Sequence, residues 1–283
     1  MARLLTGIEA ARAKREELQK RIERLRAQGT VPTVGLIRVG EKPDDIQYET
    51  AAAKLFERLG IRLEKRVFAE DVEAKRLLLE IERMNRDETV HGIMMFRPLP
   101  RRLNEEALVN AIAPHKDIDG MTNASLAGVF LNSGTGFAPC TAEACMELLD
   151  YYGIDPRGKR AVVVGRSQVI GRPVAMMLMH QNATVTICHS QTAELWKLCR
   201  EADILVAAVG KARMIDASCI GNGATVIDVG INVMPDGSVV GDVDFDSVFP
   251  VAEAISPVPR GVGSLTTTIL AAHIVKAAEE RNE

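Results

Sequence analysis

The chain has 283 residues, of which 47% are hydrophobic, and this length suffices for two modest domains or one large domain. Its 35 basic and 38 acidic residues give a net charge of −3, so it lacks the basic excess that a nucleic-acid partner requires. The apolar runs are too short to cross a membrane and no secretory signal is visible, so we expect a cytoplasmic protein without a nucleic-acid or membrane partner.

The first hundred residues alternate between helical and strand patterns. Helices are predicted over residues 8–28, 43–60 and 72–84, and strands over residues 34–39, 62–67 and 91–96. This β-α-β repetition predicts a parallel sheet with helices on its faces.

A polar, loop-rich stretch follows over residues 115–139, and then the alternation resumes. Helices are predicted over residues 141–152, with Thr141 as N-cap, and 265–280, and strands over residues 161–164, 183–187, 204–209 and 224–229, with helices between the first three. This order is typical of a Rossmann-like, parallel-sheet nucleotide-binding domain. The sequence therefore predicts two α/β domains, which we divide near Asp119.

Five scattered cysteines form neither a Cys-x-x-Cys pair nor a metal-binding spacing with histidine. Small apolar filler is the simplest interpretation of them, and reduced thiols fit a cytoplasmic enzyme.

Residues 165–171 read Gly-Arg-Ser-Gln-Val-Ile-Gly and separate a predicted strand from a predicted helix. Glycines let backbone approach a ligand closely, and a helix N-terminus offers N–H groups to a phosphate. The motif departs from the usual G-x-G-x-x-G pattern, so a purely structural turn and a dinucleotide-binding turn both remain open.

The next strand ends in residues 188–192, Cys-His-Ser-Gln-Thr, which include no carboxylate. An NAD-selective site usually places Asp or Glu there, to bind the ribose 2′-hydroxyl. His189 and Ser190 can instead donate to a phosphate, and Arg166 offers a cation. We therefore predict NADP in preference to NAD; the alternative is that Arg166 only pairs with a neighbouring carboxylate.

Residues 116–120, Lys-Asp-Ile-Asp-Gly, place two acids in a tight turn that could bind a ligand's amino groups, cap a helix or hold a metal. Further oxygen ligands do not cluster nearby, so no metal is expected. Tyr48 can stack on a flat ring or donate its phenol, or it can be an ordinary half-buried aromatic residue.

In combination, these segments resemble the FolD-type methylenetetrahydrofolate dehydrogenase/methenyltetrahydrofolate cyclohydrolase family over essentially the whole chain. The matching residues are Tyr48 and residues 98–100, 116–120, 139–141, 165–173, 183–186, 189–190, 192, 202–211, 227–232, 241–243, 257–259 and 261–263. The resemblance implies a folate-binding catalytic domain of residues 1–119 and 265–283, to which the last helix returns, and an NAD(P)-binding domain of residues 120–264. It also implies a homodimer.

The resemblance implies oxidation of methylenetetrahydrofolate to methenyltetrahydrofolate with NADP, or with NAD, in one-carbon metabolism. Tyr48 and Asp119 become the catalytic candidates. The folate-binding candidates are Tyr48, Pro98, Leu99, Asp119, Arg260, Gly261 and Gly263, and the cofactor-binding candidates are Gly165, Arg166, Ser167, Gly171, His189, Ser190, Thr192, Gly210 and Ile231.

Two departures affect the cyclohydrolase half of the family's chemistry. The family pattern Tyr-x-x-x-Lys supplies a lysine central to that step, but Ala52 occupies its place here. Lys54 lies six positions after Tyr48, about 240° round the helix and therefore on another face. Phe96 stands where a glutamine usually hydrogen-bonds the lysine. We therefore expect a dehydrogenase with weak or absent cyclohydrolase activity.

Arg97, Arg260 and Ser264 replace a usual leucine, glycine and proline on the folate side, where the arginines could read additional carboxylates. Two alternatives remain. One is a bifunctional enzyme in which Lys42 or Lys54 reaches the site, and the other is a folate- or nucleotide-binding paralogue without turnover.

Overall fold

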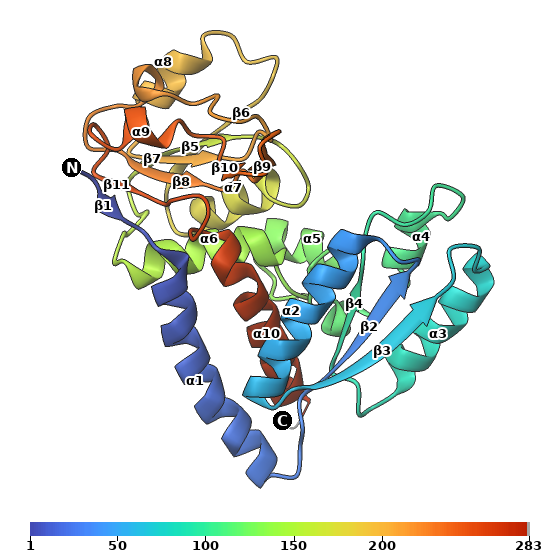
Figure 1. The fold of residues 1–283 in the computed structure, drawn as a ribbon. Coiled ribbons are helices and arrows are strands. Elements are labelled where there is room, and N and C mark those ends of the chain that lie inside the picture. The colour runs from blue at the N-terminus through green and yellow to red at the C-terminus, as the bar shows by residue number, and fades with distance from the viewer. Residues whose placement is uncertain (282–283) are drawn as a thin grey trace. The chain divides into compact units, whose positions relative to one another are not determined.

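The computed structural model describes residues 1–281, which form two compact units (Figure 1). The large-sheet unit comprises residues 1–13 and 139–266, and the small-sheet unit comprises residues 14–138 and the chain from Thr267 onward. Each unit contains a parallel sheet with helices beside it, which confirms the two-domain α/β fold class.

The small-sheet unit has three parallel strands in the order β3-β2-β4: β3 (Arg62–Phe68), β2 (Thr33–Val39) and β4 (Gly92–Met95). The central strand β2 is buried along its whole length, as expected for a strand paired on both edges, whereas β3 is partly exposed. The helices of this unit are α2 (Pro43–Leu59), α3 (Ala74–Arg86), α4 (Glu105–Val109) and α5 (Asn123–Leu131), with a short 3₁₀ turn, η1 (Pro114–Lys116).

Apolar side chains from β2, α3 and β4 form the core on one face of this small sheet. Ile37, Leu77, Ile81 and Ile93 are all fully buried there. The helix α3 therefore packs through the apolar stripe that its sequence pattern predicted.

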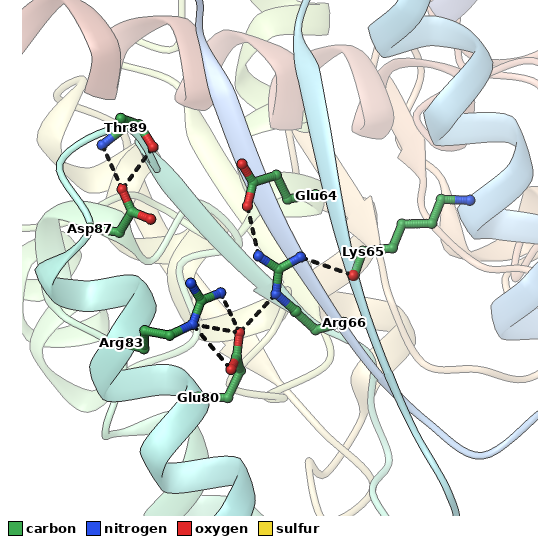
Figure 2. Close-up of polar contacts among 7 residues, drawn as sticks. All are labelled: Glu64, Lys65, Arg66, Glu80, Arg83, Asp87 and Thr89. Atoms are coloured by element: carbon green, nitrogen blue, oxygen red, sulfur yellow. Dashed lines mark hydrogen bonds and ion pairs between the residues drawn. The ribbon is translucent and has the colours of Figure 1, made fainter.

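Ion pairs join the edge strand β3 to α3 at the surface (Figure 2). Arg66 donates to Glu80 (Nε–Oε1, 2.8 Å) and to Glu64 (Nη2–Oε2, 2.8 Å), and Arg83 also donates to Glu80. Hydrogen bonds from Arg83 and Arg66 hold the pKa of the Glu80 carboxyl below its usual range. Partly exposed pairs of this kind contribute only modestly to stability. Lys65 points away from this network in Figure 2.

The large-sheet unit has six parallel strands in the order β1-β11-β8-β7-β5-β6. Their bounds are β1 (Arg3–Leu4), β5 (Arg160–Val164), β6 (Thr184–Cys188), β7 (Ile204–Ala207), β8 (Thr225–Asp228) and β11 (Ala254–Ile255). The helices are α6 (Cys140–Tyr151), α7 (Gly171–His180), α8 (Leu195–Arg200) and α9 (Phe245–Val248), with a 3₁₀ turn η2 (Ala217–Cys219); β9 (Asn232–Val233) and β10 (Val239–Val240) form a small antiparallel hairpin.

Two helices continue from one unit into the other: α1 (Gly7–Ala27) after Ala13 and α10 (Gly263–Glu280) after Thr266. The later part of α10 packs with the small-sheet unit, where His273 Nδ1 lies 2.7 Å from the Ile118 carbonyl oxygen. The last helix therefore returns to the unit that contains Tyr48. Among residues 1–281, no helix is long and apolar enough to span a membrane.

The compact units differ from the predicted division, 1–119 with 265–283 against 120–264, mainly in two segments. Residues 1–13 belong to the large-sheet unit because β1 pairs with β11, with Arg3 opposite Ala254. Residues 120–138 belong to the small-sheet unit, where Ser125 Oγ donates to Asp117 Oδ2 at 2.7 Å.

The long elements follow the predicted pattern, and two local predictions were wrong. The stretch expected to be loop contains α5, whose N-cap Thr122 accepts a hydrogen bond from the Ser125 N–H. Thr141 is not an N-cap, because α6 already begins at Cys140 after Pro139.

Candidate functional site

Tyr48 and Phe96 lie together beside the carboxyl ends of β2 and β4. Tyr48 is in α2, which follows β2, and Phe96 directly follows β4 and donates its N–H to the Ile37 carbonyl oxygen (2.9 Å). Their rings meet edge to face, with centroids 5.9 Å apart at 83°. Tyr48 is half-buried and Phe96 is only 7% exposed, so Phe96 holds one edge of the tyrosine ring in an apolar contact.

Ala52 lies one helical turn after Tyr48 and is fully buried, with 0% of its surface exposed. Lys54 is exposed, as the helical geometry predicted for a residue on another face. Positions 52 and 96, where the resemblance places a lysine and its glutamine partner, therefore contribute a methyl group and a phenyl ring. Neither side chain can transfer a proton.

Arg97, Pro98 and Leu99 form the loop after Phe96, and Arg97 links this loop to Asp119. Its Nη2 lies 3.7 Å from Asp119 Oδ2 and its Nη1 lies 4.0 Å from Glu105 Oε1. Glu105 Oε2 in turn accepts the Leu99 N–H at 2.7 Å. The candidates Pro98, Leu99 and Asp119 therefore lie close together in the structure: Arg97 contacts Asp119 directly and is linked to the Leu99 backbone through Glu105.

Lys42, at the N-cap position of α2, donates from Nζ to the Pro98 carbonyl oxygen. The Lys42 ammonium group therefore lies beside the loop of residues 97–99, and its hydrogen bond there is to a backbone carbonyl.

The two acids of residues 116–120 have different roles. Asp117 is 1% exposed and accepts hydrogen bonds from the Met121 and Thr122 N–H groups and from Ser125 Oγ, so it builds the turn and the start of α5. Asp119 is about one-third exposed at its side chain and faces Arg97. The turn and cap interpretations therefore apply to Asp117, and Asp119 is the more exposed of the two carboxylates.

Lys116 is 2% exposed and donates to the Met84 and Asp87 carbonyl oxygens, at 2.8 and 2.7 Å. It satisfies carbonyls at the C-terminus of α3, and burial lowers its pKa to about 8. Its role is structural.

Sequence reasoning missed an ion triad next to Tyr48, in which the buried Glu49 pairs with the buried Arg38 and the partly exposed Lys65. Glu49 accepts from Arg38 Nε (2.8 Å) and from Lys65 Nζ (2.7 Å), which joins α2 to β2 and β3. Burial opposes ionisation of Glu49, but hydrogen bonds from Lys65 and Arg38 outweigh it and hold its pKa below the usual range. The one signal available in the sequence was Arg38, a charge inside an apolar strand.

The glycine-bounded loop of the large-sheet unit is tightly built. Gly165 has φ +133°, and a Cβ there would lie 2.2 Å from the Ala208 carbonyl oxygen; a Cβ at Gly171 would lie 2.2 Å from the Gly165 carbonyl oxygen. Ser167 Oγ accepts the Ile170 N–H at 3.1 Å. These contacts require glycine at both ends of the loop, and they leave Arg166 and Ser167 exposed at the start of α7.

Residues 188–192 form a turn next to this loop. The Gly165 N–H donates to the Cys188 carbonyl oxygen at 2.9 Å, so the two strand ends are adjacent. The His189 N–H donates to Thr192 Oγ1 (2.8 Å), and Thr192 returns its N–H to the His189 carbonyl oxygen (2.8 Å). Thr192 therefore shapes the turn, while Ser190 is exposed at its tip.

His189 Nδ1 accepts the Gln191 N–H at 3.2 Å, a further hydrogen bond within this turn. The exposed Arg166, Ser167 and Ser190 supply a cation and two hydroxyl groups from adjacent loops. An anionic group of a nucleotide fits this set of donors.

A cavity of about 180 Å³ in the large-sheet unit brings together the candidates Ile231, Arg260, Gly261 and Gly263. Ile231 is 67% exposed, and the Cβ position of Gly263 is 3.5 Å from its Cδ1. Arg260 has φ +83°, a left-handed conformation that favours glycine. Gly210, on the loop after β7, has φ +67° with open space where a Cβ would point.

Among residues 1–281, no group of three or more His, Cys, Asp or Glu side chains has the arrangement of a metal site.

A parallel-sheet unit with a glycine-bounded turn between a strand and a helix is typical of nucleotide-binding proteins, and the chain was compared with known families. Residues 139–282 match the model of the tetrahydrofolate dehydrogenase/cyclohydrolase NAD(P)-binding domain, and residues 5–119 match that of the tetrahydrofolate dehydrogenase/cyclohydrolase catalytic domain. The chain belongs to the tetrahydrofolate dehydrogenase/cyclohydrolase family.

Individual relatives agree with this assignment. A bifunctional protein FolD from Carboxydothermus hydrogenoformans is 49% identical over 100% of this chain and 99% of the relative. The solved structure of the bifunctional enzyme FolD from Campylobacter jejuni is 36% identical, with a TM-score of 0.97 over 99% of this chain and 100% of that one. The Trypanosoma brucei FolD structure, complexed with NADP and an inhibitor, is 32% identical with a TM-score of 0.91 over 99% and 98% of the two chains.

Proposed function

We propose that this protein oxidises methylenetetrahydrofolate to methenyltetrahydrofolate with NADP as the hydride acceptor, and that its cyclohydrolase activity is weak or absent. The observation that carries the second part is the pair Ala52 and Phe96, both buried and apolar beside Tyr48.

The oxidation removes a hydride from the methylene bridge while a folate nitrogen donates its lone pair, which leaves a methenyl cation. NADP, when bound, accepts that hydride. The protein mainly has to orient the reactants and exclude water, because the electrons come from the folate itself. Tyr48 offers a half-buried ring on which the pterin can stack, and Asp119 offers a carboxylate to the pterin's amino groups.

The hydrolytic step makes a different demand. Water must add to the methenyl cation and the ring must open, with protons moved at each stage, and general acid–base help is worth about 10²- to 10⁴-fold in rate. Ala52 and Phe96 supply no titratable group. Arg97 cannot act as a base, because its guanidinium keeps its proton in proteins.

The preference for NADP rests on the donors at the cofactor turn. Arg166 and Ser190 are exposed on adjacent loops, and residues 188–192 include no carboxylate that would repel a 2′-phosphate. Gly165 and Gly171 fit a close approach of backbone to the cofactor, because their missing Cβ atoms keep the loop compact.

The test measures the two half-reactions separately with purified protein. Formation of reduced nicotinamide is followed after mixing methylenetetrahydrofolate with NADP or with NAD, and hydrolysis of methenyltetrahydrofolate is followed without cofactor. We expect rapid reduction of the nicotinamide, faster with NADP than with NAD, and hydrolysis of methenyltetrahydrofolate near the uncatalysed rate. Binding of both ligands without reduction would instead indicate the non-catalytic paralogue.

A second candidate function is the bifunctional one, because the Carboxydothermus hydrogenoformans relative at 49% identity is named a bifunctional protein. Lys42 supports this candidate, because its amine donates a hydrogen bond to the carbonyl oxygen of Pro98, a folate-binding candidate. Hydrolysis well above the uncatalysed rate that disappears in Lys42→Met would establish this candidate.

We further propose a homodimer, as the family resemblance implies. Light scattering on the eluted protein should give about twice the chain mass of 30.8 kDa; a mass equal to one chain would contradict it.

A further inference from the structure

Asp242 is a fully buried carboxylate, with 0% of its surface exposed, that collects hydrogen bonds from two separate loops. Its donors are the N–H groups of Val209 (2.6 Å), Gly210 (2.9 Å) and Lys211 (2.9 Å), and Asn232 Nδ2 (3.0 Å). Three consecutive backbone N–H groups and one side-chain amide thus surround one negative charge. The loop after β7 and the start of the β9 hairpin are therefore tied to the same group.

A second buried carboxylate, Asp228, fixes Asp242 itself. Asp228 Oδ1 accepts the N–H groups of Gly230 and Asp242, both at 3.0 Å, and its Oδ2 accepts the Val243 N–H at 3.0 Å. Burial raises the pKa of Asp228 to about 6. The two acids together join three chain segments, residues 209–211, 228–232 and 241–243.

The backbone at Gly230 and Gly241 packs so closely against these two carboxylates that no side chain fits at either position. A Cβ at Gly241 would lie 1.8 Å from Asp228 Oδ2, and a Cβ at Gly230 would lie 2.3 Å from the Asp242 carboxyl carbon. Even an alanine at either position would push the carboxylate from its donors. The arrangement therefore has little freedom to adjust when one donor or acceptor changes.

The segments held by Asp242 are those on which the cofactor candidates Gly210 and Ile231 lie. Gly210 is bonded to Asp242 directly, and Ile231 directly precedes Asn232, which is also bonded to it. Both positions face open space: no atom lies within 4 Å of a Cβ built at Gly210, and Ile231 is 67% exposed at the edge of the 180 Å³ cavity. A ligand that contacts both would depend on their spacing.

We propose that Asp242 is a positioning residue for the nicotinamide cofactor, and that its carboxylate sets the spacing between the Gly210 loop and the Ile231 segment. Asp242 does not touch the cofactor in this arrangement. A carboxylate suits the role because its two oxygens accept all four donors, whereas an asparagine has one acceptor oxygen and turns an NH₂ group towards N–H groups. The inference rests on the proposed use of NADP.

The test is Asp242→Asn, with NADP binding measured by calorimetry in the absence of folate. We expect the Kd for NADP to rise at least tenfold and the KM for NADP to rise in parallel, while the KM for methylenetetrahydrofolate stays within twofold. Asp236→Asn is the matched control, because Asp236 is exposed in the turn of the β9–β10 hairpin and accepts hydrogen bonds from the Ser238 N–H and Oγ nearby in sequence. It should change none of these constants.

A second variant covers the case in which Asp242→Asn fails to fold. Asn232→Ala removes one of the four donors and should raise the Kd for NADP about threefold or more with circular dichroism unchanged. A merely structural role predicts a lower melting temperature with an unchanged Kd well below that temperature, and this result would overturn the proposal. If the unmodified protein binds neither NADP nor NAD, the proposed function itself fails; if it binds NADP and both folded variants bind equally well, only the role of Asp242 fails.

Discussion

Introducing at positions 52 and 96 the lysine and glutamine that the family resemblance implies should raise the rate of methenyltetrahydrofolate hydrolysis. The perturbation is Ala52→Lys together with Phe96→Gln. Position 52 lies one turn from Tyr48, and residues four apart on a helix have Cβ atoms about 5–6 Å apart, so a lysine there would project beside the tyrosine ring. If it acts as a general acid–base group, hydrolysis of methenyltetrahydrofolate should rise about 10²- to 10⁴-fold, which corresponds to about 3–5 kcal/mol of barrier.

The free energy of unfolding of the variants gives a second quantitative test. Ala52 is fully buried and Phe96 is 7% exposed, so Ala52→Lys alone places an ammonium among apolar groups and should cost several kcal/mol. Phe96→Gln offers an amide oxygen to that ammonium, and a hydrogen bond to a charged group is worth about 1.5–3 kcal/mol. The two substitutions should therefore couple by about 1–3 kcal/mol in a double-mutant cycle of urea unfolding.

The matched control is Ala51→Lys with Phe96→Gln. Ala51 is exposed and lies about 100° round the helix from position 52, so a lysine there points elsewhere. This control should leave hydrolysis unchanged. The reasoning is refuted if the Ala52→Lys, Phe96→Gln protein folds and retains dehydrogenase activity but hydrolyses no faster than the unmodified protein.

Three further changes test other parts of the structure. His91 is 6% exposed and its pKa is lowered to about 4, chiefly by burial, so the folded state binds fewer protons than the unfolded state between about pH 4 and 6.5. The free energy of unfolding should therefore rise with pH across that window, by up to about 3 kcal/mol, and fall again as the pH is lowered. Urea titrations at several pH values should show a weaker pH dependence of this free energy for His91→Gln. An equal pH dependence in the variant and the unmodified protein would exclude His91 as the source. Arg166→Ala should raise the KM for NADP at least tenfold and that for NAD less than threefold in steady-state assays, and equal effects on both would show that the guanidinium does not read the 2′-phosphate. Arg260→Gly should relieve the strain of the left-handed backbone at φ +83° and stabilise the protein by about 1 kcal/mol. Arg260→Ala keeps the Cβ and should not stabilise the protein. A lower urea midpoint for the glycine variant than for the unmodified protein would disprove strain at this position.

Periodicity in the sequence predicted the longer elements, because a buried strand such as β2 or an amphipathic helix such as α3 carries its own pattern. The two-residue strands β1, β9, β10 and β11 were not predictable, since two residues contain no period. The helix α5 was missed because its apolar residues show almost no helical period and turn formers bound it on both sides, so that the N-cap Thr122 was the one clear sign of its start.

The sequence predicted those parts of the candidate site that are formed by consecutive residues. It did not predict the parts that depend on contacts between residues separated along the chain. The loop between Gly165 and Gly171 could be read directly as a strand, a turn and a helix. The separate roles of Asp117 and Asp119 could not, because they depend on Ser125 and Arg97, which reach them only in the fold. The Asp242 contacts likewise join residues about thirty positions apart.

The pairing of β1 with β11 decides how the NAD(P)-binding half could be studied in isolation. A fragment starting at Pro139 would lack Arg3 and Leu4, which hydrogen-bond along Ala254 and Ile255. Without β1, the edge strand β11 would expose unpaired backbone N–H and C=O groups to solvent, and such an edge promotes aggregation. Expressing this half on its own calls for grafting the first dozen residues back onto it, for example through a flexible tether ahead of α6.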